Sequence, residues 1–337
     1  MKLSVIIACY NDQDWLNRTI DSLYQGHDNN SFEVIVVDDS SFKPITCREP
    51  VKVLRNNLNR GVGYCFDRGV KESVGDVLML MGSDVLLRDR SWHTDALRYA
   101  TEHPNSIGCA VVSCFSPECQ DWGHPDMKKT YGATVKMIGE DTMEVYPGFD
   151  VYHQDVFVTS SYKSFPGDTV PCLIGACYVT TKSWYMHIHG WDTDGGVNAG
   201  HKHWGGLEPW ISFKTWLSGG EIRVIQPIEA GHIYGRITKP GAAHAKRGVR
   251  GDLKWYNKLF IAHTILTADE RQPLIHLIEQ NFRKNEAADL NYEKAKKMIK
   301  HVSSWIGTVR ERNIRNFENR SLSLLLEQFD INLPWKG

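Results

Sequence analysis

Three short and continuously apolar runs in the first ninety residues, each followed by polar or acidic side chains, constrain the fold more than any other feature. The runs cover residues 3–8, 32–37 and 76–81. Runs of this length without polar alternation are typical of strands that are buried on both faces of a sheet. The chain therefore begins with a buried sheet whose strands end in polar clusters.

The segments between these runs have helical periodicity. Leu16, Ile20 and Leu23 recur at intervals of four and three residues, which places them on one side of a helix. A further short strand is predicted at residues 51–54 and a helix within residues 61–73. Because strands and helices alternate, we predict an α/β fold with a mostly parallel central sheet and helices on both of its faces.

The composition excludes several classes of protein. Of the 337 residues, 42% are hydrophobic and 23% are charged, which is typical of a globular chain and not of a disordered or fibrous one. No apolar run approaches the roughly 18 residues that cross a bilayer, and the short apolar start lacks the pattern of a secretory signal. The eight cysteines lie mostly in apolar runs and fit no common zinc spacing. We therefore expect a cytoplasmic protein.

Charge is distributed unevenly along the chain. The net charge is −1, but residues 239–320 hold 17 Lys and Arg against 9 Asp and Glu, and the part before them carries −8. Apolar residues recur at helical spacing over 255–266, and further helical patterns cover 270–302 and 320–330. The sequence therefore predicts a basic helical extension at residues 241–337, which either binds a polyanion or packs against the acidic part.

Polar clusters follow three of the predicted strands, at residues 8–12, 38–41 and 82–84. In open parallel sheets, ligands bind at the carboxyl ends of the strands, so these clusters mark a candidate site. No G-x-G-x-x-G follows the first strand and no P-loop motif occurs, which argues against a dinucleotide cofactor or a P-loop nucleotide site. Taken alone, an acidic pair such as Asp38-Asp39 is more typical of a capped turn than of a ligand site.

The segments SVIIACYND, VIVVDDSS and NRGVGYCFDRGVKESVGDVLMLMGSD, in this order, resemble the nucleotide-binding half of glycosyltransferase family 2, which has the GT-A fold. In that family the second aspartate of the pair, here Asp39, accepts a hydrogen bond from the base, and the backbone of the first strand end lines the same slot. The resemblance assigns nucleotide-sugar binding to Ala8, Tyr10, Asp12, Asp39, Asp67 and Ser83, and to Arg236 in a later basic loop.

The acidic strand end at Gly82-Ser83-Asp84 implies a divalent cation. Family members carry Asp-x-Asp or Asp-x-His there, and the charge of a diphosphate leaving group is commonly neutralised by Mn²⁺ or Mg²⁺ on oxygen ligands. This chain has Gly82 in place of the first acid, so Asp84 is the candidate ligand and catalytic residue. The alternative is an ordinary turn with a solvated aspartate.

A second stretch, from Val170 onward, resembles the catalytic half of the polypeptide N-acetylgalactosaminyltransferases and their bacterial and viral relatives. It reads VPCLIGACYVTTKSWYMHIHGWDTD and then HWGGLEPWISFKTWLSGGEIRVIQPIEAGHIYGR, with matching order over about 65 residues. His232, in Gly-His-x-aromatic, matches the histidine that those enzymes use as a metal ligand. The resemblance therefore pairs His232 with Asp84 as ligands of the cation.

Glu208 is the candidate for contact with the acceptor. Pro209 suits the first turn of a helix, which places Glu208 at a helix N-terminus, where an acid is also typical of simple capping. The resemblance implies a catalytic role near the acceptor hydroxyl, although the acid lies one position later than in the peptide-glycosylating enzymes. Acceptor binding is assigned to the neighbouring residues Trp204, Gly205, Gly206 and Trp210. The rings of the two tryptophans can stack on sugars or bases.

We therefore predict a GT-A glycosyltransferase domain at residues 1–240, with a nucleotide-binding half at 1–100 and an acceptor and metal half at 165–240. It would transfer a sugar from a nucleotide-diphosphate donor, best a UDP-sugar, to a hydroxyl, with Mn²⁺ or Mg²⁺ as cofactor. Whether the reaction retains or inverts configuration stays open.

The acceptor is the least constrained part of the prediction. We expect the acceptor to be a glycan, a protein hydroxyl or hydroxymethylated DNA, in the cytoplasm of a bacterium or of a phage-infected host. DNA is included because the basic extension would attract its phosphate groups. A nucleotidyltransferase would normally show a Gly-rich basic loop after the first strand, which is absent here. The alternative of another class is an inactive GT-A-like nucleotide- or glycan-binding module, because the first acid of the metal motif is missing.

Overall fold

The structure is a computed structural model of the chain. It describes residues 1–28, 30–116, 119–124, 129–137, 149–156, 168–175, 177–195, 200, 202, 206–233, 251–282, 286–317 and 321–329.

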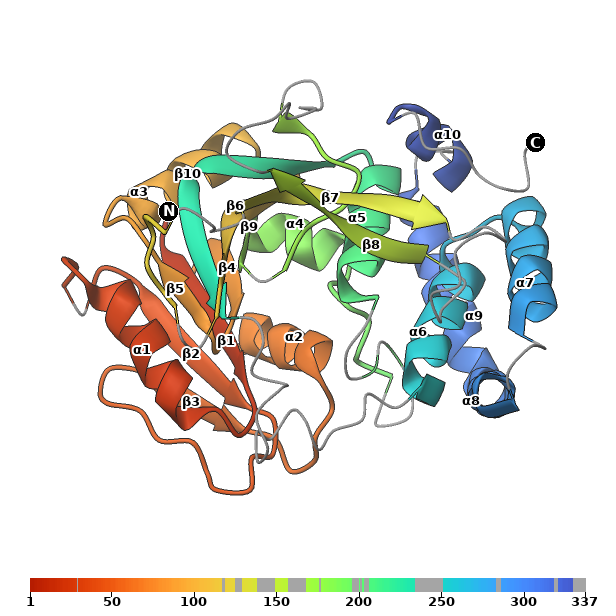
Figure 1. Cartoon of the computed structure of the whole chain (residues 1–337), viewed down its shortest axis with the longest axis horizontal. Coiled ribbons are helices and arrows are strands. Elements are labelled where there is room, and N and C mark those ends of the chain that lie inside the picture. Colours follow the sequence, from red (N-terminus) through yellow and green to blue (C-terminus); the bar gives the residue numbers. More distant parts are fainter. Residues whose placement is uncertain are drawn as a thin grey trace.

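The N-terminal part follows the predicted alternation of strands and helices (Figure 1). Its elements are β1 (Leu3–Cys9), α1 (Gln13–Tyr24), β2 (Glu33–Asp38), β3 (Lys52–Arg55), α2 (Val62–Glu72) and β4 (Val77–Gly82). Each lies within a few residues of its predicted position. Local apolar patterning therefore suffices to define this part of the fold.

The middle of the chain is richer in strands than the sequence indicated. Its elements are β5 (Val85–Leu87), α3 (Trp92–Glu102), β6 (Ser106–Phe115), β7 (Lys129–Met137), β8 (Phe149–Val156), β9 (Cys177–Thr181), α4 (Lys182–His187), α5 (Leu207–Leu217) and β10 (Glu221–Ile233). The C-terminal part is helical, with α6 (Gly251–Thr264), α7 (Ala268–Phe282), α8 (Glu286–His301), α9 (Ser303–Asn316) and α10 (Leu322–Glu327).

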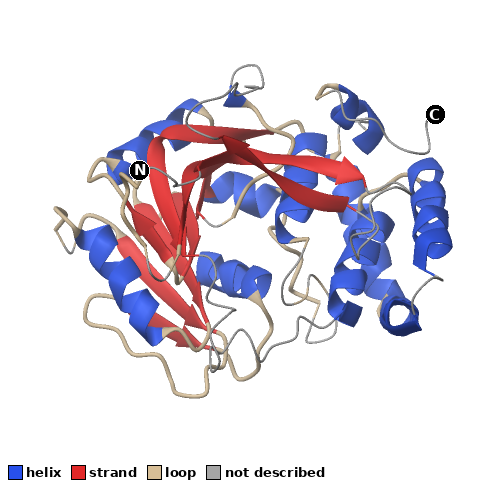
Figure 2. Ribbon diagram, viewed as in Figure 1, coloured by secondary structure: helices blue, strands red, loops and turns tan. Residues whose placement is uncertain are grey.

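The strands form one curved sheet in the order β3-β2-β1-β4-β9-β6-β10-β5, with β7 pairing with β6 and β8 with β7 (Figure 2). The pairs among β1, β2, β3 and β4 are parallel, as is β6 with β10. β9 is antiparallel to both β4 and β6, and β5 is antiparallel to β10. The predicted α/β class is confirmed, with more antiparallel pairing outside the first hundred residues than predicted.

Helices cover both faces of the sheet (Figure 1). One face packs against α1 and α3, in a cluster that includes Ile20, Leu23 and Trp92. The other face packs against α2, α4 and α5, and the same cluster continues into α6–α10, as far as Leu326. The C-terminal helices therefore share a hydrophobic core with the sheet, which a separately packed extension would not do.

The predicted helical character of the C-terminal part is confirmed. The pattern predicted at 270–302 did not separate α7 from α8, and no predicted pattern covered α9. The boundary predicted at residue 240 lies outside the described residues and stays a prediction. Within the described part of the chain, no helix has both the length and the apolar character needed to cross a bilayer.

Candidate active site

The parallel register brings three predicted polar clusters to one edge of the sheet. Ala8 pairs with Gly82 across β1 and β4, while Cys9 pairs with Asp38 across β1 and β2. The residues that follow these strands are thereby neighbours. The Ser83 hydroxyl donates a hydrogen bond to Oδ2 of Asp12 at 2.9 Å, which joins the end of β4 to the start of α1.

Asp84 and His232, which lie far apart in the sequence, come together at this edge. β5 begins directly after Asp84, and the antiparallel pairing of β10 with β5 places His232 opposite Val85. Oδ2 of Asp84 lies 3.5 Å from Nε2 of His232, with 16% and 21% of the two side chains exposed. The Ile233 amide also donates to the Asp84 carbonyl at 3.2 Å. The predicted pair is therefore adjacent and partly exposed.

This pair fits a divalent cation as a partial set of ligands. Ligands around a cation with bonds of about 2.1 Å lie about 3–4 Å apart, and the carboxylate and imidazole atoms meet that spacing. No group of three or more His, Cys, Asp or Glu among the described residues is arranged to hold a metal. The two side chains would therefore hold the cation together with diphosphate oxygens and water.

Asp39 holds the loop that leads into α2. Only 4% of the residue is exposed. Its carboxylate accepts hydrogen bonds from Nδ2 of Asn56 at 2.8 Å, from the amide of Arg60 at 2.9 Å and from the amide of Gly61 at 2.7 Å. Gly61 has φ +94°, a conformation that suits glycine. The carboxylate thus fixes the backbone of the loop that lines the predicted base-binding slot.

Asp38, which the sequence did not single out for a role, holds the other side of the slot. Burial alone would raise the pKa of its carboxyl group, but hydrogen bonds from the side chain and backbone of Ser41, from the backbone of Ile45 and from Arg55 bring the pKa below its ordinary value. The two neighbouring aspartates therefore organise two different loops.

Tyr10 and Phe42 form an aromatic rim beside this slot. Their ring centroids lie 6.1 Å apart, and Phe42 is 85% exposed. Asn11 links the two loops, since its amide donates to Oγ of Ser41 at 2.8 Å and its Oδ1 accepts from the amide of Phe42 at 2.6 Å. An exposed phenylalanine directly after Asp-Asp-Ser-Ser was a signal that the sequence analysis missed.

Asp67 takes a different place from the one that the resemblance implied. Its Oδ1 accepts from the Tyr185 hydroxyl at 2.5 Å and the Trp191 amide at 3.0 Å, and its Oδ2 accepts from the Thr193 amide at 3.1 Å and hydroxyl at 2.5 Å. Burial raises the pKa of this carboxyl group in spite of these bonds. Asp67 thus ties α2 to α4 and to the segment after it, and we assign it no direct nucleotide contact.

Glu208 lies in the first turn of α5, at a helix end that Gly206 starts with φ +75°. Its Oε1 accepts a hydrogen bond from the Tyr178 hydroxyl at 3.0 Å. A Cβ at Gly175 would lie 2.9 Å from the same oxygen, so glycine there makes room for the carboxylate. Because β9 is antiparallel to β4, the residues just before β9 lie at the edge where β4 ends. Glu208 is thereby placed near the same edge as Asp84.

The sequence comparison agrees with this geometry. The family model of Glycosyl transferase family 2 matches residues 4–159, the part that contains β1, β2 and β4 with their polar strand ends. Residues 4–159 therefore correspond to a family 2 glycosyltransferase domain.

Relatives of this domain include the polypeptide N-acetylgalactosaminyltransferases. Human polypeptide N-acetylgalactosaminyltransferase 14 is 26% identical to this chain over 245 residues, which cover 68% of the chain. Polypeptide N-acetylgalactosaminyltransferase 5 of Caenorhabditis elegans is 24% identical over 244 residues and also covers 68% of the chain. The chain spans 40% and 36% of the length of these two relatives. The crystal structure of GalNAc-T7 with UDP, GalNAc and Mn²⁺ superimposes on this chain with a TM-score of 0.56 at 15% sequence identity. The superposition covers 91% of this chain and 57% of the GalNAc-T7 chain, and it shows that the two share the GT-A fold.

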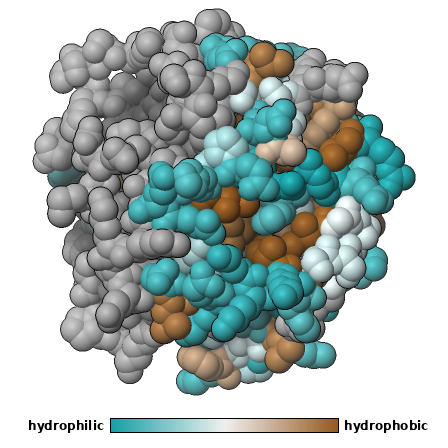
Figure 3. Space-filling model, turned by 90° about the vertical axis from the view of Figure 1, so that its right-hand side faces the viewer, coloured by the Kyte–Doolittle hydropathy of each residue, from teal (hydrophilic) through white to brown (hydrophobic). Residues whose placement is uncertain are grey.

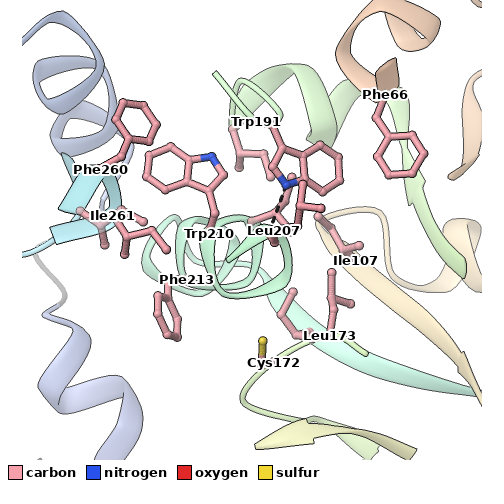
Figure 4. Packing of buried hydrophobic residues seen from close by; sticks show 14 of the residues in the cluster. Phe66, Ile107, Cys172, Leu173, Trp191, Leu207, Trp210, Phe213, Phe260 and Ile261 are labelled. Carbon is pink, nitrogen blue, oxygen red and sulfur yellow. Dashed lines mark hydrogen bonds between the residues drawn. The ribbon is translucent and has the colours of Figure 1, made fainter. Parts of the chain in front are cut away.

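The acceptor wall predicted from the sequence needs one correction. Trp210 is fully buried, and its ring packs against Phe260 of α6 with centroids 4.8 Å apart (Figure 4). It is a core residue between α5 and the C-terminal helices, and it presents no surface to an acceptor. The other predicted residues Trp204, Gly205 and Arg236 lie outside the described residues.

Proposed function

We propose that this chain transfers a sugar from a UDP-sugar to an acceptor hydroxyl, with a divalent cation held by Asp84 and His232. The observation that carries the proposal is the 3.5 Å approach of these two side chains at the carboxyl edge of a family 2 sheet. The Mn²⁺ and UDP in the GalNAc-T7 structure belong to a protein with the same fold and support the choice of donor and ion.

The cation would supply positive charge to the departing diphosphate, which is commonly the largest contribution in such chemistry. The protein itself positions the donor. Asp39 and Asp38 fix the two loops of the base slot, and Tyr10 with Phe42 offers rings against which a base can stack. The bond from Ser83 to Asp12 fixes the backbone directly before Asp84.

Glu208 would orient the acceptor hydroxyl or take its proton. Its carboxylate is half-buried and is oriented by the hydroxyl of Tyr178, whose pKa is raised by burial and by the nearby Glu208 charge. A tyrosine held in its neutral form remains a hydrogen-bond donor, so it would keep Glu208 in one orientation through the reaction.

The proposal is tested by a donor screen that measures release of nucleoside diphosphate from UDP-sugars, with Mn²⁺ and then with EDTA. We expect release that depends on the cation and is fastest with a single UDP-sugar. Binding of UDP-sugars without any release, even with candidate acceptors, would instead identify an inactive GT-A-like binding module. Full release in EDTA would contradict the assignment of the cation.

We propose a protein or glycan hydroxyl as the acceptor, because the relatives are named as polypeptide-modifying transferases. A mixture of Ser/Thr peptides and a panel of glycans, assayed with the best donor, would identify the class. Transfer to neither would remove the support that these relatives give.

Hydroxymethylated DNA is the second candidate acceptor, and one observation favours it. Lys294, Lys297 and Lys300 of α8 are exposed on one side of the helix, and no ion pair to a described acid neutralises them. Figure 3 views the side of the molecule that carries the C-terminal helices, where hydrophilic side chains surround a smaller apolar area in the described part. Such a row of lysines attracts phosphate groups at low salt.

Binding of duplex DNA across a salt series tests this candidate. We expect the substitution of all three lysines by alanine to weaken binding at low salt and to flatten its salt dependence. Lys296→Ala is the matched control, because Lys296 already pairs with Glu279 and Glu293 at 3.2 Å. Absence of binding at low salt would leave proteins and glycans as the acceptors.

A further inference from the structure

The segment between α4 and α5 is held from two sides. On one side Asp67 of α2 accepts three hydrogen bonds from the segment and a fourth from Tyr185 of α4, as described above. On the other side lies α9, which is far away in the sequence and belongs to the C-terminal helices. The segment thus connects the nucleotide-binding half with the C-terminal part.

Arg312 of α9 makes the charged part of this contact. It pairs with the buried carboxylate of Asp192 and also with Asp194, whose Oδ2 lies 3.3 Å from Nη1. The second oxygen of Asp192 binds Nζ of Lys214 at 2.5 Å, and Lys214 also donates to the Gly190 carbonyl at 2.8 Å. The side chains of Asp192 and Lys214 are 0% and 1% exposed, so this is an ion network within the core.

Two uncharged contacts from α9 reinforce it. Nδ2 of Asn316 donates to the carbonyl of His187 at 2.7 Å. A Cβ at Gly195 would collide with the indole of Trp305, so the backbone of the segment lies directly against that ring. Helix α9 therefore contacts this part of the chain from the end of α4 to Gly195.

The same segment contacts the loop that shapes the base slot. The carbonyl of Thr193 accepts a hydrogen bond from Nη2 of Arg60 at 3.2 Å, and the Arg60 guanidinium lies over the ring of Tyr64 at 3.6 Å from its centroid. The backbone amides of Arg60 and Gly61 are the donors that hold Asp39. One chain of contacts therefore runs from Arg312 through the segment to the base slot.

We propose that Arg312 is a positioning residue for nucleotide binding, through which α9 keeps residues 190–194 and the Arg60 loop in their binding geometry. The link to a nucleotide rests on the proposed function. The C-terminal helices would then take part in donor recognition. The sequence had predicted for them only binding of a polyanion or packing against the acidic part of the chain.

Arg312→Ala is a usable variant because it leaves no buried charge without an opposite charge beside it. Asp192 keeps Lys214 as its ion partner at 2.5 Å, so no buried charge remains unpaired. Replacing Asp192 would instead leave Lys214 buried without its carboxylate, which commonly destabilises a protein strongly. Arg312→Lys keeps the charge but not the forked geometry, and it serves as the conservative variant.

The experiment measures UDP affinity by calorimetry in the presence of Mn²⁺, and amide hydrogen exchange in the full-length protein without nucleotide. For Arg312→Ala we expect UDP binding about tenfold weaker, with partial recovery in Arg312→Lys. Exchange should accelerate at Trp191 and Thr193 and also at Arg60 and Gly61. Arg315→Ala is the matched control, an exposed arginine on the same helix, and should match the unchanged protein in both measurements.

A purely structural role of Arg312 would lower thermal stability while leaving UDP affinity and exchange at Arg60 and Gly61 unchanged, and that result would overturn the inference. If the unchanged protein binds no UDP, the proposed donor is wrong, but the exchange comparison still decides the coupling. Faster exchange at Arg60 and Gly61 in Arg312→Ala supports it, and unchanged exchange there refutes it.

Discussion

Replacing Asp67 by alanine should destabilise the fold because its carboxylate is the acceptor for four donors from α4 and the segment after it. Leaving a buried donor without an acceptor costs about 1–3 kcal/mol. Some donors would find water in the space that the carboxylate leaves. We therefore expect the free energy of unfolding to fall by about 4 kcal/mol, a large fraction of the 5–15 kcal/mol that is typical of a domain.

Asp67→Asn separates the loss of charge from the loss of shape. The amide retains one acceptor oxygen but turns an NH₂ group toward two donors, so we expect a loss of about 2–3 kcal/mol. Urea unfolding followed by tryptophan fluorescence measures both variants. Asp21→Ala is the control, since its ion pair with Arg48 is 66% and 58% exposed and should contribute less than about 1 kcal/mol. A loss below about 1 kcal/mol in Asp67→Ala would refute the structural role assigned to this carboxylate.

Three further predictions concern the slot, the acceptor and pH. Asp39→Ala should raise the donor KM by more than it lowers kcat, because a contact that shapes the base slot acts on ground state and transition state alike; steady-state kinetics would show an equal fall in kcat if this is wrong. Glu208→Gln should leave donor binding intact and lower transfer by about a hundredfold, and unchanged transfer would reduce Glu208 to a helix-end residue. Burial, together with two nearby arginines, lowers the pKa of His263 from 6.5 to about 4. As the pH drops from 6.5 toward 4, the unfolded state therefore binds the proton before the folded state does, and the free energy of unfolding should fall. Denaturant midpoints measured against pH should vary less in His263→Gln than in the unchanged protein.

The sequence predicted those parts of the fold that local patterning controls. The strands β1, β2 and β4 are short apolar runs with polar ends, and their parallel register follows from alternation with helices. The pairing of Asp84 with His232 was predicted from the resemblance to known enzymes, since no local pattern joins β10 to β5. Antiparallel β9, inserted between β4 and β6, had no signal in the sequence that distinguished its pairing.

The remaining contacts depend on residues that meet only in the folded chain. Asp67 was predicted to face the nucleotide because the family places polar residues there, whereas its partners come from the segment after α4. Trp210 was predicted to meet the acceptor, but Phe260 of α6 covers it. One signal was present: Lys214 stands alone in the apolar run WISFKTWL, which is typical of a buried ion pair.

The central claim is that Asp84 and His232 together hold the cation that UDP-sugar transfer needs. Mn²⁺ binding in the presence of UDP, measured by electron paramagnetic resonance alongside turnover, tests it most directly. Asp84→Ala and His232→Ala should each weaken Mn²⁺ binding and lower turnover by about a hundredfold or more, while Asp89→Ala, which removes an exposed carboxylate nearby, should leave both unchanged. Unaltered Mn²⁺ binding and turnover in either Asp84→Ala or His232→Ala would contradict the claim.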